Sequence, residues 1–101
     1  MATLINRALP WLIGLSAAAP LHAGTGYGQV SFQNNVNVTG HLYIDGNYGC
    51  GPVLMNLFCV TQVKEGNHTA YVKYDDGINV TFEPFYLEEG KVKTLTVNTS
   101  N

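Results

Sequence analysis

Residues 41–54, HLYIDGNYGCGPVL, combine a strand pattern, a turn signal and one of the two cysteines of the 101-residue chain. Apolar and polar side chains alternate from His41 to Ile44, as they do in a strand with one buried face. Asp45-Gly46 follows immediately, a pair typical of the tight turn in a β-hairpin. The stretch therefore predicts a hairpin and makes an all-β domain the first hypothesis for the fold.

The same period-2 alternation recurs at close spacing in the rest of the chain. It is seen at residues 29–32, 36–39, 70–74, 78–83 and 92–97, with turn residues between the segments. Residues 52–63, PVLMNLFCVTQV, fit either a buried strand or a strand with a loop. We expect an all-β domain, a small antiparallel β-sandwich or open barrel of six to seven short strands, spanning residues 29–101. GTGYG at 24–28 is followed by no helical pattern, so it predicts a flexible lead and not a phosphate-binding loop.

The beginning of the chain has the pattern of a secretory signal. Arg7 is followed by a mostly apolar run, and Leu21-His22-Ala23 resembles a small-residue cleavage site. The run is shorter than the about 20 residues that cross a bilayer. We therefore expect residues 1–23 to be a signal peptide, no membrane span in the mature chain, and a secreted or periplasmic location.

The composition of the remaining part excludes some partners and predicts a disulfide. The chain has few lysines and arginines and no basic cluster, so we expect no nucleic-acid binding. Cys50 and Cys59 are the only cysteines. We expect them to be bonded in an oxidising compartment, stabilising the domain by roughly 2–3 kcal/mol. Their spacing is not the C-x-x-C of a redox-active pair.

Several turn elements resemble the PEGA family of small extracytoplasmic β-sandwich modules. The resemblance rests on LYIDGNYGCGP, EGNHTAYVKYDDG and LEEGKVKTLTV, and covers roughly residues 28–98. The Pro-Glu-Gly-Ala-like start is absent, and the stretch from Pro52 to Gly66 is longer than the family pattern. The resemblance implies a binding or spacer module and not an enzyme. The structural turn residues, from the resemblance and the turn signals together, are Asp45, Gly46, Gly49, Pro52, Gly66, Gly77 and Gly90.

We find no motif that carries catalysis or binds a metal. His41 and His68 each begin an alternating segment, and no cysteine or carboxylate lies at ligand spacing. Asp75-Asp76-Gly77 lacks the alternating oxygen ligands of a calcium loop and predicts a hairpin turn. No serine has the context of a nucleophile, and neither histidine shows an acid partner in the sequence. We expect no enzymatic activity, no metal and no cofactor.

Two features point to binding or modification. The chain holds six tyrosines, and alternation places Leu42, Ile44, Ala70 and Val72 in the core. Tyr43 and Tyr71 then face outward, as a candidate contact face for protein or glycan; the alternative is ordinary cross-strand packing. Sequons begin at Asn37, Asn67, Asn79 and Asn98, and they matter only in a eukaryotic secretory pathway.

The sequence therefore favours a secreted or periplasmic non-enzymatic binding or adaptor module that acts through protein or glycan contacts. Two alternatives stay open at this point. One is an inhibitor or toxin-like effector of another secreted protein. The other is a structural subunit that assembles by strand addition at a sheet edge. The identity of the partner and the oligomeric state are left open by the residues.

Overall fold

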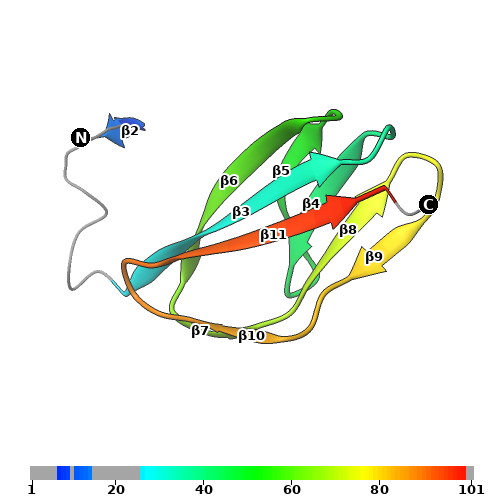
Figure 1. Ribbon diagram of the computed structural model, residues 1–101. Helices are drawn as coiled ribbons and strands as arrows, with labels where there is room; N and C mark the ends of the chain where they lie inside the picture. Colours follow the sequence, from blue (N-terminus) through cyan, green and yellow to red (C-terminus); the bar gives the residue numbers. More distant parts are fainter. Residues whose placement is uncertain (1–6, 10, 15–25, 100–101) are drawn as a thin grey trace.

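The computed structural model describes residues 7–9, 11–14 and 26–99 (Figure 1). Within the predicted signal peptide it describes two short antiparallel strands, β1 (Arg7–Leu9) and β2 (Trp11–Gly14). The predicted cleavage site and residues 24–25 of the predicted lead lie outside the described residues. No described segment forms a helix, and so none forms one long and apolar enough to cross a membrane.

The domain consists of nine strands that form two main sheets (Figure 1). The strands are β3 (Tyr27–Asn35), β4 (Gly40–Ile44), β5 (Asn47–Val53), β6 (Leu57–Lys64), β7 (Gly66–His68), β8 (Ala70–Tyr74), β9 (Asn79–Thr81), β10 (Phe85–Leu87) and β11 (Val92–Asn98). One sheet has the order β11-β3-β6 and the other the order β5-β4-β8-β9, while β7 and β10 form a separate pair. The all-β prediction is confirmed, and the strands exceed six or seven partly because β7 and β10, each three residues long, lie outside the predicted segments.

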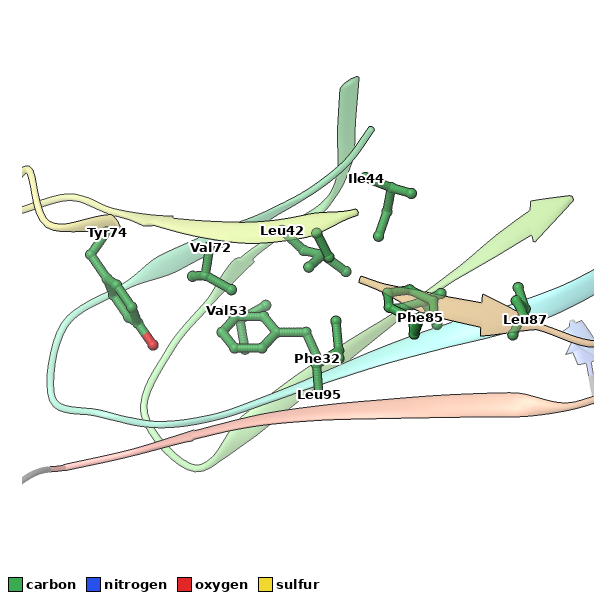
Figure 2. Close-up of a cluster of buried hydrophobic side chains, with 11 residues drawn as sticks. Phe32, Leu42, Ile44, Val53, Val72, Tyr74, Phe85, Leu87 and Leu95 are labelled. Carbon is green, nitrogen blue, oxygen red and sulfur yellow. The ribbon is translucent and has the colours of Figure 1, made fainter. Parts of the chain in front are cut away.

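The hydrophobic core lies between the two sheets, as the alternation predicts. In β3, β4 and β8 every second side chain is buried, and the intervening ones are exposed or half-buried. Figure 2 shows Phe32 and Leu95 of one sheet facing Leu42, Val72 and Val53 of the other. Phe85 and Leu87 of β10 extend the core at one end, and Tyr74 lies at the other. The alternating apolar residues thus become the facing layers of a sandwich.

The last strand closes the domain by an unpredicted pairing. β11 pairs in parallel with β3, with Leu95 opposite Phe32, whereas β3 and β6 are antiparallel. All other strand pairs in the domain are antiparallel. The antiparallel prediction therefore holds for most of the sheet structure but not for this pair, which joins the two ends of the domain.

One buried polar residue fastens the end of β3. Asn34 is fully buried, and its Nδ2 donates to the carbonyl oxygens of Val38 and Val53 at 2.9 and 2.8 Å. Its Oδ1 accepts from the Val36 N–H and from the Tyr74 hydroxyl, both at 3.0 Å. Each polar group of the side chain is therefore hydrogen-bonded, as burial requires. Burial raises the pKa of Tyr74, and the negative charge of Asp76 adds to this effect.

Three segment boundaries differ from the prediction. Tyr27 and Gly28 belong to β3 and not to a flexible lead; Gly28 is buried, and a Cβ there would lie 2.8 Å from the backbone oxygens of Glu88 and Lys91. Residues 36–39 form a loop, although the side chains of Val36 and Val38 pack against the core. Residues 52–63 divide between β5, a turn and β6, so the strand-with-loop alternative is correct.

Candidate functional site

Three tyrosines form a row on the outer face of the four-stranded sheet. Tyr43 of β4 lies between Tyr71 of β8 and Tyr48 of β5 in the strand register. The rings of Tyr43 and Tyr71 are stacked, with centroids 4.9 Å apart and planes at 3°. Tyr48 meets Tyr43 edge-on, at 5.4 Å and 89°. We call Tyr48, Tyr43 and Tyr71 the tyrosine row.

The structure brings the two predicted contact residues together on the outward phase of their strands. Tyr43 and Tyr71 are half-buried, while the neighbouring Leu42 and Val72 are fully buried in the core. Tyr48 was not predicted as part of this cluster, because its position depends on the register between β4 and β5. The cross-strand packing that was the alternative is present, and the role of these residues as a contact face stays a prediction.

The geometry of the row decides which part of each ring a partner can meet. One face of Tyr43 is covered by Tyr71, and the edge-on ring of Tyr48 is its other aromatic neighbour. A sugar ring packs best on an open aromatic face, and stacking with Tyr71 takes one face of Tyr43.

His41 extends the tyrosine row toward the β8–β9 turn. Its Nδ1 is 3.2 Å from the Tyr48 hydroxyl, and its Nε2 is 3.0 Å from Oδ1 of Asp75. The expectation that neither histidine has an acid partner was wrong. Asp75 is 34 residues from His41 in the chain, and the antiparallel pairing of β4 and β8 brings them together.

His68 also has an acid partner, and this contact fixes a turn. Its Nδ1 is 2.5 Å from Oδ2 of Asp45, and its Nε2 is 2.6 Å from the Lys64 carbonyl oxygen. Burial lowers the pKa of His68, but hydrogen bonds to Asp45 and Lys64 together raise it above its usual value. The hydrogen bond from the Thr69 N–H, followed by that from His68, lowers the pKa of Asp45. Because both neighbours of the ring are acceptors, they favour the imidazolium.

The predicted turn residues fall into two groups. A left-handed backbone conformation is found at Asp45, Gly46, Gly66, Gly77 and Gly90. Gly49 and Pro52 lie within β5, and Gly49 is not among the residues with positive φ. Gly49 therefore lies in a strand and not in the predicted turn; a Cβ there would lie 3.1 Å from the Leu42 carbonyl oxygen, so close packing explains its small size.

The disulfide between Cys50 and Cys59 is present, with Cα atoms 6.1 Å apart. Cys50 lies on β5 and Cys59 on β6, which belong to different sheets. The predicted disulfide is thus a link between the two layers of the sandwich.

An exposed apolar segment, which the alternation does not predict, lies at the β5–β6 turn. Its members are large apolar residues that are about half exposed or more, namely Leu54, Met55, Leu57, Phe58 and Val60. Phe58 is 64% exposed. The period-2 pattern alone does not show whether this side chain is buried or exposed. We call these five residues the apolar segment. Leu54 and Met55 also line a shallow hollow of about 260 Å³ with Asn37, Val38 and Thr39.

The structure also places the candidate metal ligands and the sequon asparagines. Among the described residues no three His, Cys, Asp or Glu side chains lie close enough to hold a metal ion. The four sequon asparagines, Asn37, Asn67, Asn79 and Asn98, are all exposed.

No protein-family model and no curated protein sequence matches the chain. The resemblance to the PEGA family therefore stays a prediction.

Proposed function

We propose that this protein is a non-enzymatic binding module that works outside the cytoplasm and contacts a protein partner through the tyrosine row. The observation that carries the proposal is the mutual contact of Tyr43, Tyr48 and Tyr71 on the outer face of one sheet. Tyrosine is enriched at protein interfaces because it offers a large, rigid apolar area together with a hydroxyl.

A protein partner suits the row better than a glycan. Stacking between Tyr43 and Tyr71 covers one face of each ring. His41 and Asp75 add a polar margin beside Tyr48. An aromatic centre with a polar rim is the usual composition of a protein interface.

The proposed location rests on two features. The N-terminal segment has the pattern of a secretory signal, and an intramolecular disulfide is consistent with an oxidising compartment. The resemblance to PEGA-family modules agrees with an extracytoplasmic binding role.

The test compares Tyr43→Ala and Tyr71→Ala with a matched control, Tyr86→Ala. Tyr86 lies on β10 outside the row and is 60% exposed. Partners captured from envelope extract by the wild-type protein are identified, and their affinities for the variants are measured. We expect both row variants to weaken binding at least about 30-fold, which corresponds to about 2 kcal/mol, and Tyr86→Ala to have little effect.

The melting temperatures of the three variants complete the experiment. We expect all of them to stay within a few degrees of the wild-type value, since each side chain lies outside the core. Equal affinity of the row variants and the control would contradict the proposal. Binding of the wild-type protein to a glycan array, lost in Tyr71→Ala, would instead favour a glycan partner.

A further inference from the structure

The apolar segment continues into β6, a strand at the edge of its sheet. The order β11-β3-β6 leaves one side of β6 unpaired within that sheet, and Figure 1 shows β6 at its margin. β6 is eight residues long, and residues 57–63 carry no charge. A long edge strand with exposed apolar side chains is a template for pairing with another strand.

The register with β3 shows which backbone groups of β6 are open. The Glu65 N–H donates to the Gly26 carbonyl oxygen, which continues the register that places Tyr27 opposite Lys64. Bonded pairs alternate in an antiparallel ladder. The N–H and C=O groups of residues 59, 61 and 63 therefore bond β3, and those of Phe58, Val60 and Gln62 point to the open edge.

The other sheet edges are protected in ways that β6 is not. β9 is only three residues long. β5 contains Pro52 and irregular pairing with β4. β11 carries the exposed Lys93 within the strand. Short length, proline, bulges and lysine are the usual protections against edge pairing. In β6 the only charge is Lys64, at the end of the strand.

We propose that β6 pairs antiparallel with β6 of a second copy, forming a two-fold symmetric dimer with one continuous sheet across it. A register with Phe58 opposite Val60 of the second copy brings apolar side chains together at both symmetry-related positions. Both residues direct their backbone groups to the open edge, so the same pairs satisfy these groups. Each copy has a formal net charge of −2, so an uncharged contact segment avoids direct like-charge pairing.

A second copy fits this edge because antiparallel pairing of a strand with itself is self-complementary. Such an isologous contact closes at two subunits and does not propagate into a filament. The five side chains of the apolar segment, each about half exposed, present on the order of 400 Å² per copy. The total area that the dimer can bury is therefore below the roughly 1,200 Å² buried in stable complexes. The dimer should therefore be concentration-dependent, and it leaves the tyrosine row accessible on the other sheet.

Sedimentation velocity of the full chain tests the dimer, from about 5 μM to about 1 mM. We expect a monomer–dimer equilibrium in the wild-type protein. Val60→Lys places a charge at the centre of the edge and should raise the dissociation constant at least about tenfold. Thr94→Lys is the matched control, because Thr94 is exposed on the same sheet face but on β11; it should leave the equilibrium unchanged.

Amide hydrogen exchange by NMR tests the pairing itself. The amides of Phe58 and Val60 should exchange fast when dilute and slow down at high concentration. Those of Cys59 and Thr61 should be protected at every concentration, because they bond β3. A monomer throughout the range, a dimer that persists in Val60→Lys, open-ended oligomers, or protection without this alternation would each overturn the proposal.

Discussion

Single polar residues decide the local geometry at both ends of the sandwich. Asn34 binds the loop after β3 to the end of β5 through the Val38 and Val53 carbonyl groups. At the opposite end of β4, Asp45 adopts a left-handed conformation with φ of 52° and accepts hydrogen bonds from Thr69 and His68. Asp45 is therefore both a turn residue and the charge partner of His68.

The pair of Asp45 and His68 predicts a pH-dependent stability. The pKa of His68 is raised by folding, so its contribution is complete at low pH and is lost as the pH rises through the folded pKa. The pKa of Asp45 is lowered, so its contribution is lost only as the pH falls through that lowered value. Between about pH 5 and pH 8, where His titrates, the free energy of unfolding should therefore decrease with increasing pH.

Urea denaturation over this pH range measures the effect. Asp45→Asn removes the carboxylate but keeps a residue that tolerates the left-handed conformation. We expect the variant to lose most of the pH dependence while keeping the fold, and His68→Gln should behave in the same way. A slope in either variant equal to that of the wild-type protein would show that other groups cause it.

At the scale of the elements, hairpin turns decide which consecutive strands become neighbours in a sheet. The β4–β5 hairpin was predictable from Asp45-Gly46, since a tight turn of this kind requires positive φ at both positions. The β5–β6 connection, which joins the two sheets, was ambiguous in the sequence. Its segment, residues 52–63, is mostly apolar, and Asn56, with φ of 69°, marks the turn less clearly than an Asp-Gly pair.

Replacing Gly46 by valine should destabilise the protein more than replacing Tyr48 by serine. Gly46 has φ of 83°, and no atom lies within 4 Å of the position a Cβ would take, so the cost is one of backbone strain. For a β-branched residue we expect about 1–3 kcal/mol. Tyr48→Ser removes a 52% exposed ring from the row and should cost less. Equal urea midpoints for the two variants would contradict this assignment of the turn.

The whole molecule is held together by the core and by one covalent link between the layers. The two sheets meet through side chains from β3, β11, β4, β8 and β5. The Cys50–Cys59 disulfide joins them at the strands β5 and β6. A small domain buries a limited fraction of its surface, so such a link contributes a considerable part of its stability.

Reduction of the disulfide should lower the free energy of unfolding by roughly 2–3 kcal/mol without abolishing the fold, because the closed loop is short. Cys50→Ser with Cys59→Ser should give a similar loss. Circular dichroism of the reduced protein should retain the β spectrum, with a lower urea midpoint. Mass spectrometry without reduction should show the loss of two protons. Two free thiols in the secreted protein, or complete unfolding on reduction, would contradict the prediction.

The sequence by itself determined the class of the fold and the inward faces of the strands. Successive side chains of a strand point to opposite faces of the sheet. Because Leu42 and Val72 are apolar and face the core, their neighbours Tyr43 and Tyr71 lie on the opposite face. It also indicated the disulfide, since only one cysteine pair is possible.

Only the tertiary structure decided what depends on contacts between distant segments. The parallel pairing of β11 with β3, the partners of His41 and His68, and the addition of Tyr48 to the tyrosine row all follow from strand register. The exposure of Phe58 follows from its register opposite Gln33, which places it on the outer face of the three-stranded sheet. Local patterns specify which way a side chain points from its strand, but not which strand lies beside it, because pairing joins residues far apart in the chain.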